Sequence, residues 1–268
     1  MALKIATWNV NSIAARLPLA TQWLESYLPE QRPDIICLQE IKCVDEKFPA
    51  AAFASLGYQS LVYGQPAYNG VAILVKDEMA AGITEIQKGM PGEEEGAPRR
   101  LLSAVINGLR VVNVYIPNGQ AVGAEKYYYK LDWLARLRAY FDSLGDNSQP
   151  VVLLGDFNVA PDPLDVYDPA VWEGKILFSQ PEKQALQVVK DWGLIDTFRT
   201  LYPDTVAFSW WDYRQAGFRR NLGLRIDHIW VTPPLMQVCR EVVIEKEPRG
   251  WERPSDHTPV VATFELVK

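Results

Sequence analysis

Short apolar runs alternate along the chain with longer segments in which apolar residues recur every three or four positions. The short runs predict β-strands, because an extended segment buries alternate side chains or, inside a sheet, nearly all of them. The predicted strands are residues 3–9, 34–40, 58–63, 70–76, 101–106, 109–116, 151–154, 225–232, 241–245 and 259–266. The longer segments predict helices with one apolar face. These are residues 16–28, 48–56, 125–144 and 181–192, with a further helical turn within 194–202.

Proline, glycine and asparagine mark where these elements end. Pro29 ends the first predicted helix and Gly193 the fourth, because neither residue continues a helix well. Asn107 and Gly108 separate two apolar runs, which predicts a type I′ hairpin. The acidic segment 89–98 lies between apolar runs and is expected to be an exposed loop within a domain.

The order of these elements indicates an α/β fold. Many short strands, joined by both hairpins and helical crossovers, predict two mixed sheets covered by helices. The chain contains no Gly/Ser-rich linker and no repeat of fixed period, so residues 1–268 are expected to form a single domain.

Composition narrows the possible classes of protein. The chain has 268 residues, of which 48% are hydrophobic and 22% charged, as is usual for a globular protein. Its beginning lacks the apolar core of a secretory signal, and no stretch approaches the ~20 apolar residues of a membrane span. We therefore expect an intracellular, cytoplasmic protein with no membrane partner. The three cysteines form no CxxC pair, which argues against a disulfide framework or a zinc site.

The net charge of −6 argues against non-specific coating of nucleic acid, but one segment has the opposite sign. Residues 210–225 contain a single aspartate and are rich in aromatic residues and arginines: Arg214, Arg219, Arg220 and Arg225. This combination is typical of a nucleic-acid-binding face, although a solvated charged loop can have the same composition.

The run VVLLGDFNVAP, residues 151–161, joins a predicted buried strand to polar chemistry. Asp156 and Asn158 are two positions apart, so their side chains point the same way from an extended backbone. A carboxylate and a carboxamide at the rim of a sheet could belong to a hydrolytic site, or they could cap the loop as an Asx-turn.

Polar residues also stand at the ends of other predicted strands. They are Asn9, Glu40, Tyr115, Asp227, Asp256 and His257. Carboxylate and amide oxygens suit Mg²⁺ or Mn²⁺ better than zinc, and the sequence contains neither a histidine cluster nor a Walker loop. Glu40 is either a metal ligand or a solvated loop residue. His228 should point away from the face that carries Asp227, so we do not assign it to a site.

Seven short motifs lie between Trp8 and Val260, in the order WNVNS, LQE, NVYIPNG, GDFN, FSWWDYR, LRIDHIWV and PSDHTPV. Together they closely resemble the exonuclease III family of apurinic/apyrimidinic (AP) endonucleases, within the endonuclease/exonuclease/phosphatase superfamily. GDFN and SDH fit the whole superfamily, whereas NVYIPNG and the block from WDYR to LRIDH narrow the resemblance to the DNA-repair branch. The resemblance implies a DNase I-like, four-layered α/β sandwich of two mixed β-sheets packed face to face and flanked by helices.

The resemblance also implies roles for the strand-end residues. Metal binding is implied for Asn9, Glu40, Asp156, Asn158, Asp256 and His257. Participation in catalysis is implied for Tyr115, Asp156, Asn158, Asp227 and His257. Asp156 would activate or deliver the hydrolytic water, Tyr115 and His257 would contact the phosphate, and Asp227 would fix the tautomer of His257. The cofactor implied is Mg²⁺, with Mn²⁺ as a substitute.

Contacts with DNA are implied for a third set of residues. These are Arg99, Arg100, Trp210, Arg214, Arg219, Arg220, Leu224 and Ile226. Trp210 matches the pocket for the abasic sugar, with Leu224 and Ile226 as co-lining residues. Leu224 is not aromatic, which distinguishes that wall of the pocket.

The expected function is therefore that of a Mg²⁺-dependent, monomeric DNA-repair nuclease. It would cut duplex DNA 5′ to abasic sites and trim 3′ ends as an exonuclease and phosphatase. One alternative is a phosphoinositide or lipid phosphatase of the same superfamily, and another is a non-catalytic nucleic-acid-binding module with this fold. The arginine- and aromatic-rich segment argues against the first alternative, and the complete set of strand-end residues argues against the second.

Overall fold

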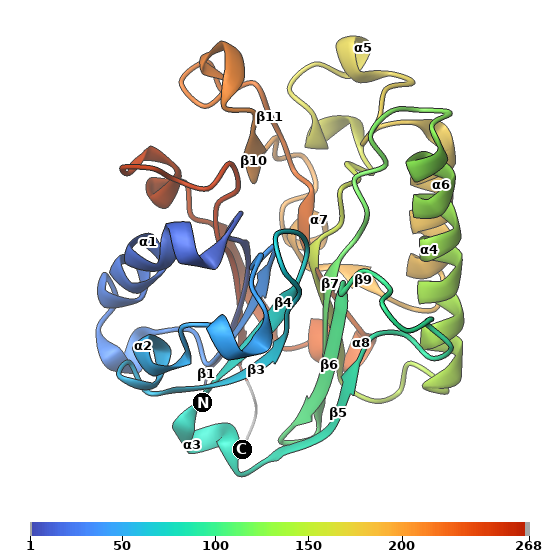
Figure 1. Cartoon of the computed structure of the whole chain (residues 1–268). Helices are drawn as coiled ribbons and strands as arrows, with labels where there is room; N and C mark the ends of the chain where they lie inside the picture. The colour runs from blue at the N-terminus through green and yellow to red at the C-terminus, as the bar shows by residue number, and fades with distance from the viewer. Residues whose placement is uncertain (1, 266–268) are drawn as a thin grey trace.

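The computed structural model describes residues 2–265, and two six-stranded β-sheets packed face to face form its centre (Figure 1). The first sheet has the order β13-β14-β1-β2-β4-β3. Its strands are β1 (Ala2–Asn9), β2 (Ile35–Gln39), β3 (Tyr58–Tyr63), β4 (Val71–Lys76), β13 (Cys239–Ile244) and β14 (Val260–Glu265). The second sheet has the order β5-β6-β7-β8-β12-β9. Its strands are β5 (Ile83–Lys88), β6 (Leu101–Ile106), β7 (Leu109–Tyr115), β8 (Val151–Asp156), β9 (Ile195–Asp196) and β12 (Asp227–Val231).

Helices cover the outer faces of both sheets. In Figure 1, α1 (Ile13–Glu25) and α2 (Ala50–Ala54) flank the first sheet, and α4 (Glu125–Ser143) and α6 (Gln180–Lys190) flank the second. The remaining helices are short: α3 (Asp77–Ala80), α5 (Pro169–Trp172), α7 (Thr197–Leu201) and α8 (Pro233–Met236). Single 3₁₀ turns span Pro29–Gln31, Asp45–Lys47, Pro163–Asp165, Arg214–Ala216 and Glu247–Gly250.

Three apolar layers hold this arrangement together, and β8 shows how the sequence produces them. Val152 and Leu154 point between the two sheets, into the same cluster as Ile5 of β1. Val151 and Leu153 point outward and pack with residues of α4 and α6. A third cluster joins the first sheet to α1 and α2. A strand buried on both faces needs apolar residues at successive positions, which explains the continuous run VVLL.

Strand pairing brings the predicted site residues to one edge of the sandwich. Tyr115 and Asp227 both lie opposite Asp156, because β7 pairs parallel to β8 and β12 pairs antiparallel to it. In the first sheet, the parallel pair β1 and β2 ends at Asn9 and Gln39, so Glu40 follows directly at the same edge.

Loops rise above this edge (Figure 1). A two-stranded ribbon, β10 (Trp210–Trp211) with β11 (Gly223–Leu224), stands opposite the loop that carries α5. The segment between β10 and β11 contains the predicted basic stretch. An apolar cluster that includes Val166, Phe178 and Ile226 joins the two loops at their base.

The structure confirms the four-layered sandwich and most of the predicted strands. The hairpin at Asn107 and Gly108 is also as predicted, since both residues have the positive φ that a type I′ turn requires. The first helix was misplaced: it spans Ile13–Glu25, because the amides of Ser12 and Ile13 donate to carbonyls of the loop after β2 and so fix its start.

Other boundaries also differ from the prediction. The strand predicted from 225 begins at Asp227, because residue 224 pairs with β10 in the separate ribbon. The strand predicted from 241 begins at Cys239, with an irregularity in its pairing with β14. Strand β5 was not predicted, because its residues ITEIQK have weak apolar periodicity, and the helices α3, α5 and α8 were not predicted, because they are short. Residue 266, the predicted end of the last strand, lies outside the described residues.

Candidate active site

Asp156 is the centre of the polar cluster at the upper edge of the sandwich. It ends β8 and is buried, with three hydrogen bonds to its carboxylate. Asn9 Nδ2 and Asn158 Nδ2 donate to Oδ2 at 2.9 and 3.0 Å, and the main-chain amide of Asn158 donates to Oδ1 at 2.9 Å. Burial raises the pKa of Asp156 to about 7; His257 opposes this rise and Asp227 adds to it.

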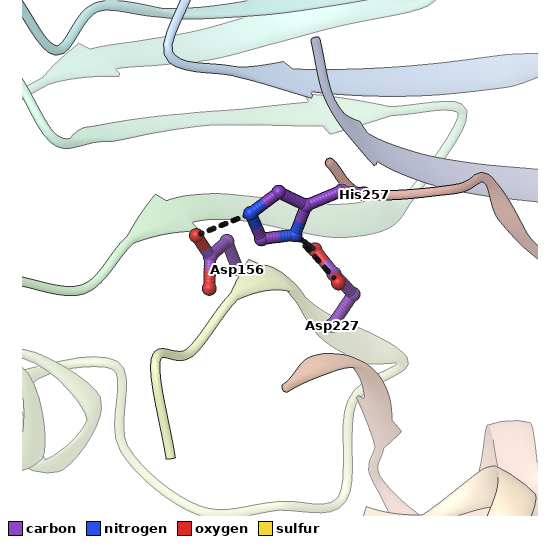
Figure 2. A group of neighbouring side chains, drawn as sticks. All are labelled: Asp156, Asp227 and His257. Atoms are coloured by element: carbon purple, nitrogen blue, oxygen red, sulfur yellow. Dashed lines mark hydrogen bonds and ion pairs between the residues drawn. The ribbon is translucent and has the colours of Figure 1, made fainter. Parts of the chain in front are cut away.

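His257 lies between two carboxylates, as Figure 2 shows. Its Nδ1 is 3.0 and 2.9 Å from the two oxygens of Asp227, and its Nε2 is 3.7 Å from Asp156 Oδ2. Burial disfavours the imidazolium, but Asp227 and Asp156 outweigh it and raise the pKa of His257 to about 10. The ring is therefore a cation at neutral pH, with Nε2 aimed at the site.

Asp227 is itself held by Ser209, a residue that the sequence analysis missed. Ser209 Oγ donates to Asp227 Oδ2 at 2.6 Å and accepts from the main-chain amides of Ile226 and Asp227. Ser209 lies in the FSWWDYR motif, but its role appears only in the fold, because it approaches Asp227 when the segment before β10 folds over β12.

Oxygen ligands for a hard cation gather beside this trio. Asp156, Asp227 and His257 offer ligand atoms within 4.8 Å of one another. Because Asp227 binds the protonated His257 through both of its oxygens, this pair is better suited to hold charge than to ligate a metal. The carboxylates of Asp156 and Glu40 and the carbonyl oxygen of Asn9 are the ligand types that Mg²⁺ or Mn²⁺ prefers. The residues present thus fit such an ion.

Glu40 and Asp256 stand on the side of the first sheet. Glu40 follows β2 with a positive φ of 55°, and Lys42 Nζ is 3.2 Å from its carboxylate. Asp256 accepts hydrogen bonds from Trp210 Nε1 at 3.0 Å and Asn11 Nδ2 at 2.9 Å. Burial alone would raise the pKa of Asp256, but His257 and these two donors lower it. The pKa of Asp256 therefore lies below its ordinary value.

Tyr115 ends β7 beside Asp156. Burial and the neighbouring carboxylates of Glu40 and Asp156 raise the pKa of its hydroxyl well above the ordinary value. Arg100 stacks over its ring at 4.7 Å. Tyr115 therefore stays protonated and can donate a hydrogen bond to an anion.

The structure divides the predicted basic residues into different environments. Arg219 and Arg220 are exposed, and Arg214 is exposed but paired with Asp212 at 3.0 Å. Arg99 is partly exposed, lies 3.7 Å from Asp45 and donates to the carbonyl of Gly64. The DNA contacts assigned to these arginines remain predictions.

Arg225 does not belong to the basic face, contrary to the sequence analysis. Its side chain is 1% exposed, and it donates to Asp165 at 2.7 and 3.1 Å and to Asp196 at 3.2 and 2.8 Å. The reason is the alternation of the segment: Leu224 and Ile226 face the apolar cluster, so Arg225 points the other way, into the protein.

The residues predicted to line the sugar pocket lie at the base of the two raised loops. Trp210 pairs with Leu224 across the ribbon, and Leu224 and Ile226 are buried in the apolar cluster with Phe178. Trp210 is only partly buried and connects this cluster to Asp256. His228 lies apart from the site, as expected, with Nε2 3.1 Å from the carbonyl of Val159.

Comparison with known proteins identifies the class that this fold and site define. The model of the Endonuclease/Exonuclease/phosphatase family matches residues 6–257, so the chain belongs to this family. It is 37% identical to exodeoxyribonuclease III of Haemophilus influenzae, over 98% of this chain and 100% of the relative. The chain is thus a phosphodiester hydrolase similar to exodeoxyribonuclease III.

Solved structures agree with this assignment. The 3′ phosphatase NExo from Neisseria, bound to a product DNA hairpin, is 41% identical with a TM-score of 0.91, covering 98% of this chain and 100% of that one. An AP endonuclease from Archaeoglobus fulgidus is 38% identical, also with a TM-score of 0.91 and the same coverage. Within residues 2–265, no helix has the length and apolar character needed to cross a bilayer.

Proposed function

We propose that this chain is a Mg²⁺-dependent DNA-repair nuclease that acts as a monomer on duplex DNA. It cuts 5′ to abasic sites and trims 3′ ends, as an exonuclease and as a phosphatase, and Mn²⁺ can replace Mg²⁺. The observation that carries this proposal is the buried group of Asp156, His257 and Asp227, which lies beside the oxygen ligands Asn9 and Glu40.

The geometry supports hydrolysis by attack of water on phosphorus. The oxygen of the water bonds to phosphorus while Asp156 takes a proton from that water. The bond from phosphorus to the 3′ oxygen, which is the leaving group, breaks. A pKa near 7 suits this proton acceptor at neutral pH. Glu40 and Asn9 would hold the cation, which would supply charge neutralisation at the phosphate.

The other groups stabilise the charge that grows on the phosphate oxygens. The imidazolium of His257 presents Nε2 to the phosphate, while Asp227 keeps the ring charged and oriented. Tyr115 adds a neutral donor, and Asn158, whose side-chain amide donates to Asp156 and to the carbonyl of Ile116, holds the carboxylate in place. Donors fixed before the reaction stabilise the transition state without having to reorganise.

Recognition of DNA is supported by the loops above the site. Trp210, backed by the buried Leu224 and Ile226, offers an apolar face for an extrahelical sugar. The arginines proposed to contact phosphates are Arg99, Arg100, Arg214, Arg219 and Arg220. Relatives named as nucleases and AP endonucleases support this substrate over a lipid phosphate. The intact set around Asp156 supports an enzyme over a binding module.

An end-labelled duplex carrying one abasic analogue tests the proposal. With Mg²⁺, we expect incision 5′ to the analogue, and a second duplex with a 3′ phosphate should lose it. EDTA should stop both reactions, and Mn²⁺ should restore them. If neither duplex is cleaved by the purified protein with either metal, the proposed function is wrong.

A further inference from the structure

Lys130 is a charged residue below the active site that the proposed mechanism does not use. It lies on the inner side of α4, and its side chain has 0% exposure. An ammonium carries three donors, and a buried one must satisfy them all. Lys130 Nζ donates to the main-chain carbonyl of Asn158 at 2.6 Å, to that of Asn118 at 3.2 Å and to the carboxylate of Glu182.

These contacts are part of a closed network of hydrogen bonds that joins the two active-site loops. Asn118 follows β7 and Asn158 follows β8, and their side chains meet where Asn118 Nδ2 donates to Asn158 Oδ1 at 3.0 Å. Lys130 therefore binds the main chain of the same two residues that bind each other through their side chains. Asn158 Nδ2 then continues the network to Asp156 Oδ2 at 3.0 Å.

The surroundings leave Lys130 little freedom. Glu182 accepts from the amides of Leu177 and Ser179 at 3.1 Å, so it is fixed at the start of α6. A Cβ added at Gly119 would lie 3.2 Å from Lys130 Cδ and 2.9 Å from Ile176, which means that the loop passes directly over the lysine stem. Burial, pairing and close packing together hold the ammonium in one place.

We infer that Lys130 is a positioning residue for catalysis. It holds Asn118 and Asn158, on the loops after β7 and β8, in place relative to Asp156. This inference rests on the proposed function, because Asn158 is assigned to the reaction there. Stability alone does not account for the arrangement, since buried ion pairs can often be replaced by apolar or neutral groups at little cost. A lysine that binds two loop carbonyls instead sets the geometry of the groups that these loops carry.

Lys130→Met combined with Glu182→Gln separates a positioning role of Lys130 from a purely stabilising one. It removes both charges, so neither partner is left buried and unpaired, and the carboxamide introduced at position 182 can still accept from Ser179. We expect thermal unfolding close to that of the wild type. We expect kcat on the 3′-phosphate duplex to fall about 10–100-fold, as for other residues that orient reacting groups, with KM nearly unchanged. The matched control is Arg138→Met, which removes another link between α4 and α6, the hydrogen bond to Val188, far from the site.

A double-mutant cycle with Asn158→Ala shows whether Lys130 acts through Asn158. If it does, the charge-free pair should lower kcat little further once Asn158 is already alanine. If the losses of kcat in the charge-free pair and in Asn158→Ala multiply, the inference is wrong. It is also wrong if the charge-free variant folds and has the kcat of the wild type.

If the double variant does not fold, Lys130→Gln is used in its place. Glu182 is then unchanged and keeps its charge and the hydrogen bonds that it accepts from main-chain amides. The same cycle and the same outcomes apply. Different results contradict the proposed function and the role of Lys130. An inactive wild type contradicts the proposed function, whereas an active wild type with an unchanged Lys130 variant contradicts only this inference.

Discussion

At the scale of single residues, the site depends on how each charge is balanced. Asp156 is buried among amide donors, which hold its position without cancelling its basicity. Asp227 instead faces the imidazolium of His257 and is locked by Ser209. The two aspartates thus have different tasks, because the hydrogen bonds to Asp156 come from amides, whereas Asp227 binds the imidazolium of His257 through both of its oxygens.

Asp156→Asn should keep the fold and remove nearly all turnover. The amide has the size of the carboxylate but does not accept a proton from water, so kcat should fall by at least about 10²–10⁴. Steady-state rates on the abasic duplex measure this. Asp191→Asn, an exposed substitution at the end of α6, is the control. A rate near that of the wild type would show that Asp156 does not handle the attacking water.

Glu40→Gln should raise the Mg²⁺ concentration needed for half-maximal activity, by about tenfold or more. A neutral amide binds a hard cation more weakly than a carboxylate does. A Mg²⁺ titration of the cleavage rate tests the prediction, with the exposed Glu78→Gln as control. An unchanged titration curve would place the ion elsewhere in the site.

Asp227→Asn should lower the pKa of His257 from about 10, because Asp227 is the main group that favours its charged form. A folded-state pKa raised by a partner means that the charge is present below that value and lost above it. The variant should therefore lose the imidazolium at a lower pH than the wild type does.

The chain has only two histidines, so NMR titration in EDTA can follow both rings, with His257→Gln assigning the signals. If His257 titrates at the same pH in both proteins, Asp227 does not set its charge.

At the scale of elements, Arg225 joins three segments that are distant in the sequence. It binds Asp165 in the 3₁₀ turn before α5 and Asp196 at the start of α7, while it stands between β11 and β12. Arg199 of α7 also binds Asp165, at 2.6 Å. This buried cluster anchors the base of both loops that rise above the site.

Arg225→Met should destabilise the protein by about 3–5 kcal/mol, because it leaves Asp196 buried without its main cation. Urea unfolding at pH 7 measures the change. The surface pair of Arg138, which is partly exposed, and Asp142 gives the control, since Arg138→Met should cost no more than about 1 kcal/mol. A loss below about 1 kcal/mol for Arg225→Met would contradict the anchoring role.

The same cluster determines part of the loss of folding stability at acid pH. Burial would raise the pKa of Asp196, but Arg225 outweighs it and holds that pKa well below the ordinary value of about 3.9. The stabilisation is therefore present above the unfolded-state pKa and is lost as the pH falls through the lower folded-state value. In Arg225→Met, urea stability should fall less steeply over this acid range than in the wild type.

At the scale of the whole molecule, an acidic chain must bind an anionic polymer through a local face. The net charge is −6, so attraction to DNA has to come from exposed arginines near the site. Arg219 and Arg220 are consecutive and exposed on the segment between β10 and β11, which stands above the edge that carries Asp156 (Figure 1).

Changing Arg219 and Arg220 together to alanine should reduce the slope of log K against log salt by about 1.8, at ~0.9 per phosphate contact. Binding to intact and abasic duplexes should weaken similarly, because phosphate contacts position the protein without discriminating. Fluorescence anisotropy over a salt series measures both effects. Arg240→Ala, at the far end of β13, serves as control, and an unaltered slope would place the DNA face elsewhere.

Trp210→Ala provides the contrast within the same experiment. Trp210 stands at the apolar wall beside Asp256, so its loss should weaken abasic incision far more than binding to intact duplex. The expected contribution is about 1–3 kcal/mol, as for stacking on an aromatic side chain. Equal weakening for both duplexes would contradict the pocket assignment.

The sequence by itself determined the elements whose signals are local. The run VVLL and the Asn107–Gly108 turn depend only on neighbouring residues, and each has the structure that was predicted. Asp156 and Asn158 do meet, but not from an extended backbone: Asn158 has a φ of 50°, and its main-chain amide donates to Asp156 as in the alternative Asx-turn. The motifs from Trp8 to Val260 were also sufficient to indicate the family, which the comparison confirmed. The roles assigned to individual residues remain predictions.

Only the tertiary structure decided which distant residues meet. The loop after β2 sets the start of α1, and the ribbon of β10 and β11 turns Arg225 inward. Ser209 and Lys130 reach the site from segments that are distant in the sequence. The physical reason is the same in each case. A buried polar group needs a partner, and that partner is chosen by the packing of the sheets and loops, over separations that no local pattern records.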